Sequence, residues 1–313
     1  MKEKRFKKIY VEISNACNLK CDFCPTVNLP QNYMGRELFE KIVKQLPKLA
    51  NSMNLHIMGE PLNHPNIAEF IEICERYSMP VTIVTNGTLL SPKYQQALLN
   101  PIVQQVNFSL QSFDANYPEA DNTAFLNRIF EYTKSAFEKR PDQHINYRLW
   151  NVSDYKDALP YNKDLIGKMK KFFGLEEDDE LSHISLRGKK VTKSLHLNLA
   201  TRFDWPSLDL PFRTTEGTCP GLITQLGILA DGTVVPCCLD KDGKIDLGNC
   251  KDQTIEAIIA SERAQNVIRG FKCRELTEEL CQHCTFIERF EKKVRWIKGH
   301  QTWTRHNPEN EVL

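Results

Sequence analysis

The chain has 313 residues, which is enough for one large domain or two smaller ones with a well-filled core. Its 41 basic and 40 acidic residues leave a formal charge of +1, so the molecule as a whole lacks an electrostatic footprint for nucleic acid or an anionic membrane. The sequence has no apolar run near about 18 residues and no apolar segment directly after Met1–Arg5, so we expect a cytoplasmic protein that does not enter a membrane.

Eleven cysteines are the most unusual feature of the composition. A reducing compartment does not sustain structural disulfides, so this number of thiols favours ligation of a metal or an iron–sulfur cluster. Cys74 lies apart from the others in an apolar helical context, and we expect it to be a buried core thiol.

Between residue 8 and about residue 200, short apolar β-like runs alternate with longer segments of helical period, which is typical of βα units and a parallel sheet. Strands are predicted near residues 8–14, 53–58, 80–85, 103–110, 144–150 and 183–199. Helices are predicted between them, near residues 36–50, 66–78, 91–99, 122–139 and 161–173. Six such units predict an α/β fold, a partial (β/α)6 TIM-like barrel.

The first cysteine group directly follows the first predicted strand. Cys17, Cys21 and Cys24 lie on one short loop at intervals of four and three residues, where three thiolates can converge on one centre. Three soft ligands can hold an iron–sulfur cluster, and its fourth iron then has no protein ligand and is open to an exchangeable one. A structural zinc loop or three unrelated cysteines are the alternatives.

Polar residues follow the ends of the next strands, where a parallel βα barrel places its ligand-facing loops. Glu60 supplies a carboxylate for an ammonium group, and Arg148 supplies a planar fork for a carboxylate. Neutral donors and acceptors suited to ribose hydroxyls come from Asn86, Ser109 and Gln111. The alternative at each position is a loop residue that caps its own backbone. The full set of loop candidates is Gly59, Glu60, Thr85, Asn86, Ser109, Gln111 and Arg148.

The chain then becomes less regular. Residues 176–180 are all acidic and are expected to form a solvated connection. Residues 184–199 are expected to form a hairpin or a bent last strand. The aromatic and charged group at residues 202–206 either lines a substrate mouth or pins a linker.

A second cysteine group begins at Cys219. The Asp231-Gly232 turn between two apolar runs predicts a hairpin that brings Cys219 back towards Cys237 and Cys238. A helix is predicted near residues 253–269, and the pair Cys281 and Cys284 follows it. Together these residues offer a complete set of four thiolates, which zinc would also satisfy.

The spacing C-x3-C-x2-C after a strand, with Phe23 just before the third cysteine, resembles the signature of the radical S-adenosylmethionine (SAM) superfamily. The resemblance implies the partial barrel and a 4Fe-4S cluster that chelates SAM and cleaves it to a 5'-deoxyadenosyl radical. It also implies that Gly59 and Glu60 bind the methionine amine and that Phe23 belongs to the cofactor site. Many members carry an acidic residue where Gln111 stands, which puts the ribose contact in doubt.

The second cysteine group resembles the C-terminal SPASM or shortened "twitch" extension that carries auxiliary 4Fe-4S clusters. The resemblance implies one auxiliary cluster, on Cys219, Cys237, Cys281 and Cys284. Cys238, Cys250 and Cys273 are left over, and a second cluster would need a ligand from outside the cysteines. We therefore expect a radical SAM barrel over residues 1–205, an auxiliary cluster domain over 206–290 and a tail over 291–313.

A radical SAM enzyme of this kind is expected to abstract hydrogen from a substrate C–H bond and to oxidise, dehydrogenate or cross-link a small molecule or peptide. It would need a reductant such as flavodoxin or ferredoxin. No catalytic acid or base is identifiable. A non-catalytic Fe-S electron carrier or redox sensor is the alternative, and an RNA-modifying enzyme is another. Basic residues and tryptophans near a last helix at 285–299 are expected to pack on the body and complement the helix dipole, with RNA contact as their other interpretation.

Overall fold

The computed structural model describes residues 4–150, 160–175, 189–200 and 202–287. Within these residues one sheet has the strand order β6-β7-β5-β4-β3-β2-β1-β8-β9. Its strands are β1 (Phe6–Val11), β2 (Ala50–Asn54), β3 (Val81–Thr85), β4 (Val103–Ser109), β5 (His144–Leu149), β6 (Lys189–Thr192), β7 (Leu195–Leu199), β8 (Gln225–Ile228) and β9 (Val234–Val235). Neighbouring strands from β7 through β5, β4, β3, β2 and β1 to β8 pair in parallel, and β6 and β9 pair antiparallel at the two edges.

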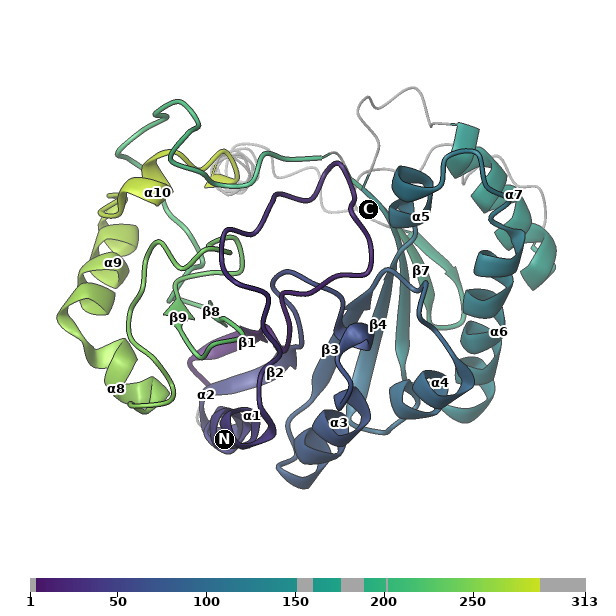
Figure 1. Cartoon of the computed structure of the whole chain (residues 1–313), viewed down its shortest axis with the longest axis horizontal. Helices are drawn as coiled ribbons and strands as arrows, with labels where there is room; N and C mark the ends of the chain where they lie inside the picture. Colours follow the sequence, from purple (N-terminus) through teal and green to yellow (C-terminus); the bar gives the residue numbers. More distant parts are fainter. Residues whose placement is uncertain (1–3, 151–159, 176–188, 201, 288–313) are drawn as a thin grey trace, which may run out of the picture.

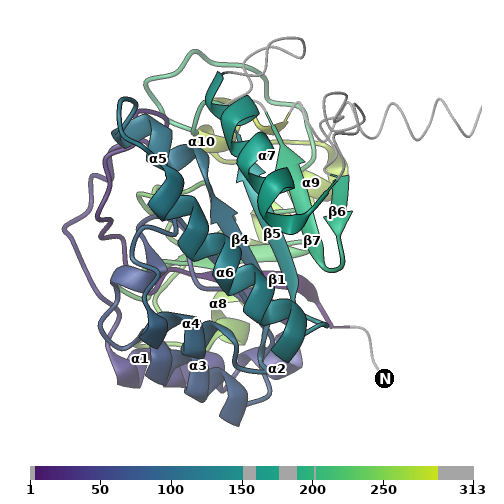
Figure 2. The same cartoon turned by 90° about the vertical axis from the view of Figure 1, so that its right-hand side faces the viewer.

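Helices α1, α3, α4, α6 and α7 cover the outer face of this curved sheet, as Figure 1 shows. The helices of the described chain are α1 (Arg36–Val43), α2 (Leu46–Leu49), α3 (Ile67–Arg76), α4 (Pro92–Leu98), α5 (Gln111–Asn116), α6 (Thr123–Lys139), α7 (Pro160–Phe173), α8 (Ile255–Ala260), α9 (Glu262–Cys273), α10 (Glu279–Gln282) and the 3₁₀ turn η1 (Pro61–Asn63). In Figure 2, α6 and α7 lie side by side over β4, β5 and β7. In α6, Phe125, Ile129, Tyr132 and Ala136 recur at helical spacing and are buried, which explains why this face packs on the sheet.

The barrel prediction is confirmed by this arrangement. The six predicted βα units appear as β1 to β5 and β7 with their helices, and the sheet stays open instead of closing into a full barrel. The segment before residue 200 forms the hairpin β6–β7 in its described part. The hairpin predicted at Asp231-Gly232 is present as β8 and β9, with Gly232 at a positive φ of 95°.

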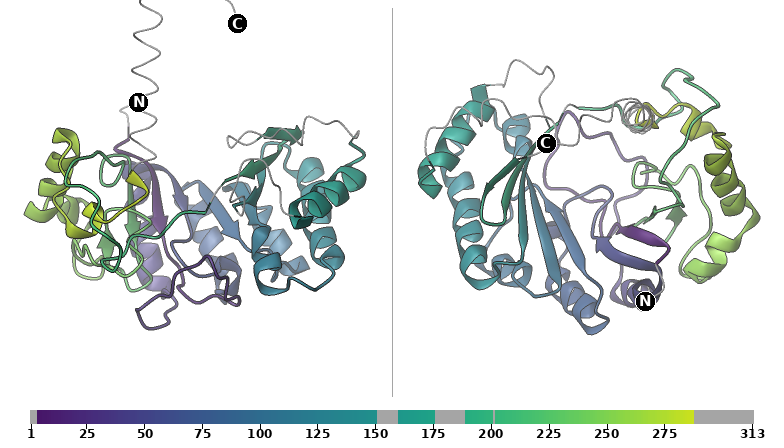
Figure 3. Two further views of the ribbon diagram at one scale, coloured as in Figure 1. Left: turned by 90° about the horizontal axis from the view of Figure 1, so that it is seen from above. Right: turned by 180° about the vertical axis from the view of Figure 1, so that it is seen from behind.

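Two features differ from the sequence-based expectation. The helix predicted at 253–269 is two helices, because Ser261 adopts extended backbone angles and its hydroxyl caps the start of α9 by accepting from the N–H of Ala264. The second difference is that β8 pairs in parallel with β1, so the hairpin of the second cysteine group extends the barrel sheet. Figure 3 shows this joint from behind, with α8 and α9 outside the hairpin.

One hydrophobic core runs through the barrel and the C-terminal region. Cys74 is fully buried in it, as predicted, and Cys250 is buried there as well. No helix among the described residues is both long and apolar enough to cross a membrane. The acidic block at 176–180 and all but the start of the helix predicted at 285–299 lie outside the described residues. The domain boundary at residue 205 stays a prediction.

Candidate active site

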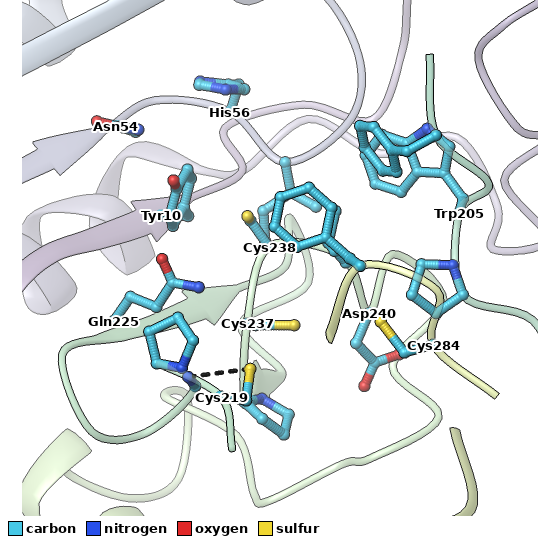
Figure 4. A pocket seen from close by; sticks show the side chains of 18 of the residues that line it. Tyr10, Asn54, His56, Trp205, Cys219, Gln225, Cys237, Cys238, Asp240 and Cys284 are labelled. Atoms are coloured by element: carbon cyan, nitrogen blue, oxygen red, sulfur yellow. Dashed lines mark hydrogen bonds between the residues drawn. The ribbon is translucent and has the colours of Figure 1, made fainter. Parts of the chain in front are cut away.

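A cavity of about 600 Å³ opens on the inner face of the sheet, between the barrel strands and the C-terminal region. Its walls come from β1, β5, the first cysteine loop, the linker at 202–206 and the second cysteine group. Figure 4 shows part of this lining, with Tyr10 and His56 on the barrel side and the cysteines of the second group opposite. Arg202, Phe203 and Trp205 also line it, so the linker aromatics belong to the cavity wall.

The loop that carries Cys17, Cys21 and Cys24 is held by hydrogen bonds at its base and to its sulfurs. The Asn15 side chain accepts from the N–H of Asn32 at 2.7 Å and donates to the carbonyl of Pro30 at 2.9 Å, which closes the loop. The backbone N–H of Leu19 donates to Cys17 Sγ at 3.4 Å.

Asn116, which the sequence did not single out, is the second sulfur donor. Its amide donates to Cys21 Sγ at 3.1 Å and accepts from the N–H of Lys20 at 2.8 Å. A hydrogen bond from the Cys24 thiol lowers the pKa of Cys21 to about 6, while that same bond and burial raise the pKa of Cys24. N–H donors around the sulfurs are what a thiolate-bound cluster requires.

Gly59 lies directly against the start of this loop. It has a positive φ of 74°, and a Cβ there would overlap the carbonyl oxygen of Ser14 and crowd that of Ala16. The next N–H, from Glu60, donates to the carbonyl of Ala16 at 3.0 Å. Only glycine allows this approach, so the Gly59-Glu60 turn fixes the position of the cysteine loop.

The Glu60 carboxylate is buried and has three donors in the described chain. Oε1 accepts from Thr85 Oγ1 at 2.7 Å and from the N–H of Leu62 at 3.0 Å, and Oε2 accepts from the N–H of Asn86 at 2.7 Å. Burial raises the pKa of Glu60 to about 7, against the lowering effect of these bonds. Glu60 therefore joins the loops after β2 and β3, and its contact with the SAM amine stays a prediction.

Asn86 continues this connection towards the cysteines. Its amide donates to Asn18 Oδ1 at 3.0 Å and lies 3.9 Å from Cys17 Sγ, and its Oδ1 accepts from the N–H of Thr88 at 2.9 Å. Thr85 and Asn86 are thus next to the predicted cluster.

The remaining predicted cofactor residues line the cavity itself: Phe23, Ser109, Gln111 and Arg148. Gln111 Oε1 and Arg148 Nε are buried and have no hydrogen-bond partner among the described residues. The guanidinium of Arg202 lies 5.4 Å from the centre of the Phe23 ring. Unpartnered polar atoms that face a cavity are free to bind a ligand, so these residues fit a cofactor or substrate.

The second cysteine group gathers at the opposite wall. Cys219, Cys237, Cys281 and Cys284 all line the cavity, although they come from three separate segments. Burial raises the pKa of the Cys219 thiol to about 12, and neighbouring thiols add to the rise at Cys219, Cys237 and Cys281. The N–H of Gly221 donates to Cys219 Sγ at 3.4 Å.

Of the leftover cysteines, Cys238 also lines the cavity. It hydrogen-bonds with the Tyr10 hydroxyl, and in Figure 4 it lies on the Tyr10 side of the cavity. Cys250 is buried in the core and Cys273 is exposed. Ligation of an auxiliary cluster by Cys219, Cys237, Cys281 and Cys284 stays a prediction.

Within the described chain, no three Cys, His, Asp or Glu side chains are grouped closely enough to hold a single metal ion.

Glu12, which directly follows β1, is a second residue that the sequence analysis did not identify. Its carboxylate accepts from the N–H of Met58 at 2.9 Å and from the N–H of Ala230 at 3.1 Å. Glu12 thereby ties the segment before Gly59 to the hairpin of the second cysteine group. Its only sequence signal is a charge on a predicted strand.

Comparisons with known proteins agree with this geometry. A family model of the radical SAM superfamily matches residues 11–150, and the SPASM model, described as an iron-sulfur cluster-binding domain, matches residues 219–285.

The chain is also similar to individual proteins. It is 29% identical over 127 residues to the tungsten-containing aldehyde ferredoxin oxidoreductase cofactor-modifying protein of Pyrococcus furiosus, covering 39% of this chain and 35% of that protein. It is 31% identical over 111 residues to the S-adenosyl-L-methionine-dependent 2-deoxy-scyllo-inosamine dehydrogenase of Niallia circulans, covering 33% of this chain and 44% of that one. The alignments thus span less than half of either relative.

Two solved structures share the fold. BtrN in complex with AdoMet and 2-DOIA has a TM-score of 0.56 at 17% identity, covering 90% of this chain and 94% of that chain. Streptococcus suis SuiB bound to the precursor peptide SuiA has a TM-score of 0.58 at 16% identity, covering 92% and 73%. With both family models matching the segments that carry the two cysteine groups, the chain belongs to the radical SAM superfamily and carries a C-terminal SPASM domain, with a SAM-binding 4Fe-4S cluster and auxiliary cluster chemistry.

Proposed function

We propose that this protein oxidises a small molecule by removing a hydrogen atom from one of its C–H bonds, with dehydrogenation as the net reaction. The observation that carries the proposal is that Cys24 of the first cysteine group and Cys219, Cys237, Cys281 and Cys284 of the second all line one cavity of about 600 Å³. A substrate bound between them is within reach of a radical source and of an electron acceptor.

When bound, the first cluster supplies the electron that splits SAM into methionine and the 5'-deoxyadenosyl radical. The chain's own residues then have two tasks. Cys17, Cys21 and Cys24 hold the cluster. The Leu19 N–H donates a hydrogen bond to the sulfur of Cys17, and the Asn116 amide donates one to the sulfur of Cys21. Gly59 and Glu60 keep the loops after β2 and β3 against it, and we assign the methionine end of SAM to this corner.

In this proposal the second cysteine group makes the net reaction an oxidation of the substrate. A substrate radical that loses one more electron and a proton becomes the dehydrogenated product, and four fully ligating thiolates hold a cluster suited to taking that electron. We assign this role to Cys219, Cys237, Cys281 and Cys284. A flavodoxin or ferredoxin would supply the first electron, and free thiols suit a reducing, cytoplasmic compartment.

A small substrate is favoured by the size of the cavity, which is in the range of drug-sized ligand sites. The Niallia circulans relative, named as a dehydrogenase, supports this reaction class. SuiB, which was solved with a precursor peptide, keeps peptide cross-linking as the second candidate.

Deuterium transfer tests the proposal. The reconstituted protein is reduced anaerobically with SAM and a deuterated cell extract that has been divided into small-molecule and peptide fractions. We expect deuterium in 5'-deoxyadenosine with the small-molecule fraction. Transfer with the peptide fraction alone would favour cross-linking, and no 5'-deoxyadenosine at all would favour an electron carrier.

A further inference from the structure

Two cationic side chains face the barrel side of the cavity. Lys8 lies on β1 and Arg148 on β5, and both line the cavity together with His56, which follows β2. Lys8 lies before Tyr10 on the same strand face, with its ammonium group 5.2 Å from the Tyr10 ring centre. Arg148 is close enough to lower the pKa of both Lys8 and His56.

Neither cation forms an ion pair with a carboxylate of the described chain. No ion pair or hydrogen bond joins Lys8 Nζ or the Arg148 guanidinium to a described residue, and Arg148 Nε is buried without a partner. The contact of Arg148 is with the Trp150 ring, 4.8 Å from the ring centre. Burial lowers the pKa of Arg148 to about 10, which reflects this lack of compensation.

The single carboxylate among the described lining residues is already engaged. Asp240 accepts from the N–H of Lys244 at 2.9 Å and of Ile245 at 2.8 Å. In Figure 4 it lies beside Cys284, away from Tyr10 and His56. The barrel side of the cavity therefore holds positive charge that no described carboxylate neutralises, and such charge is costly unless a ligand pairs with it.

His56 adds a neutral donor to this group. Its Nδ1 is buried without a partner, and burial together with Arg148 and Lys8 lowers its pKa to about 3, so the ring is uncharged at neutral pH. A neutral imidazole keeps one N–H, which can donate to an oxyanion.

Lys8 lies away from the predicted SAM corner, whereas Arg148 borders it. Lys8 is three positions before Val11, the last residue of β1, and the cysteine loop, Gly59 and Asn86 come after strand ends. Arg148 comes directly before Leu149, the last residue of β5, and pairs in register with Ser109. An anion that reaches Lys8 would thus extend deeper into the barrel than the cluster.

We propose that Lys8 and Arg148, with His56 beside them, form a subsite for an oxyanion of the substrate, a carboxylate or a phosphate. This inference rests on the proposed function and names its substrate class: an acid or a phosphate ester whose reacting C–H bond lies towards the cysteine loop. The competing assignment is that Arg148 holds the carboxylate of SAM, as the sequence predicted.

The test compares Lys8→Met with Lys7→Met, its exposed neighbour on the opposite face of β1. Thermal unfolding of the reconstituted holoenzyme is followed anaerobically against sodium phosphate or acetate, with sodium chloride at matched ionic strength as reference. We expect phosphate, acetate or both to raise the wild-type melting temperature saturably, above the chloride reference. Saturation by one salt identifies the oxyanion.

Lys8→Met is expected to melt higher than wild type without oxyanion, because a half-buried charge without an ion pair is gone, and to bind the oxyanion at least about tenfold more weakly. Its SAM affinity should stay within about twofold of wild type, and Lys7→Met should match wild type throughout. The proposal is overturned if neither salt exceeds chloride, or if Lys8→Met weakens SAM and oxyanion binding together. Oxyanion binding without any deuterium transfer would contradict the proposed reaction but would still support the oxyanion subsite.

Discussion

Glu12 is a buried carboxylate with two backbone donors, and burial raises its pKa from the usual 4.5 to about 7. The folded protein therefore binds a proton that the unfolded chain has already lost between these two pH values. The free energy of unfolding should fall by roughly 3 kcal/mol as pH rises through this window and stay level above it.

Glu60, whose pKa burial also raises to about 7, adds a decline over the same window, so we expect Glu12→Gln to remove only the part that is due to Glu12. Urea unfolding of the anaerobic holoenzyme at pH 5.5 and at pH 8 measures it, with the exposed Glu72→Gln as control. If the Glu12→Gln and wild-type proteins lost the same stability between these pH values, the assignment of the proton to Glu12 would be wrong.

Gly59 is required by its backbone conformation and by the closeness of the cysteine loop. Gly59→Ala should displace that loop, with a loss of stability of about 2 kcal/mol or more and a loss of the SAM-binding cluster. Gly167→Ala in α7, where a Cβ meets nothing within 4 Å, should keep full iron content. Equal iron content in the two variants would contradict this explanation.

Cys237 and Cys238 are neighbours in sequence with different surroundings. Cys237→Ala should remove the auxiliary cluster, about four iron atoms per chain. Cys238→Ala should keep the iron, because Cys238 hydrogen-bonds with Tyr10. Iron analysis and low-temperature electron paramagnetic resonance distinguish the two variants. Loss of iron in Cys238→Ala but not in Cys237→Ala would mean that Cys238, and not Cys237, is the cluster ligand.

At the scale of elements, α5 acts as a clamp on the cysteine loop through Asn116. Asn116→Leu removes an N–H donor to Cys21 Sγ, so the reduction potential of the SAM-binding cluster should fall. A redox titration measures it, and the auxiliary cluster in the same sample serves as control. An unchanged potential would mean that the Asn116 bond to sulfur is lost when the cluster is bound.

Local patterns made many of these elements predictable. Alternation of apolar runs and helical segments indicated β1 to β5 and their helices, and the Asp231-Gly232 turn indicated β8 and β9. Spacing within one loop was enough to group Cys17, Cys21 and Cys24. The break at Ser261 was not predicted, because the apolar period continues through it while one capping hydroxyl decides the backbone.

Pairings between distant parts of the chain could not be predicted in this way. The parallel register of β1 with β8 and the bond from Ala230 to Glu12 join residues more than 200 positions apart. Asn116 is an ordinary polar residue at a helix end until the fold brings it to Cys21. In the sequence, Lys8 and Arg148 look unrelated because they lie on different strands.

At the scale of the whole molecule, the β1–β8 pairing makes the SPASM region a continuation of the barrel sheet. Cys24 of the first cysteine group and the cysteines of the second group therefore line one cavity, over a continuous core. This arrangement makes an electron path through the substrate, from one cluster to the other, the central claim of the account.

The most direct measurement is 5'-deoxyadenosine and product formation by Cys281→Ala and Cys21→Ala under anaerobic reduction, with the exposed Cys273→Ala as control. We predict that Cys21→Ala abolishes SAM cleavage, that Cys281→Ala keeps cleavage but loses the oxidised product, and that Cys273→Ala keeps both. Full product formation by Cys281→Ala would contradict the account.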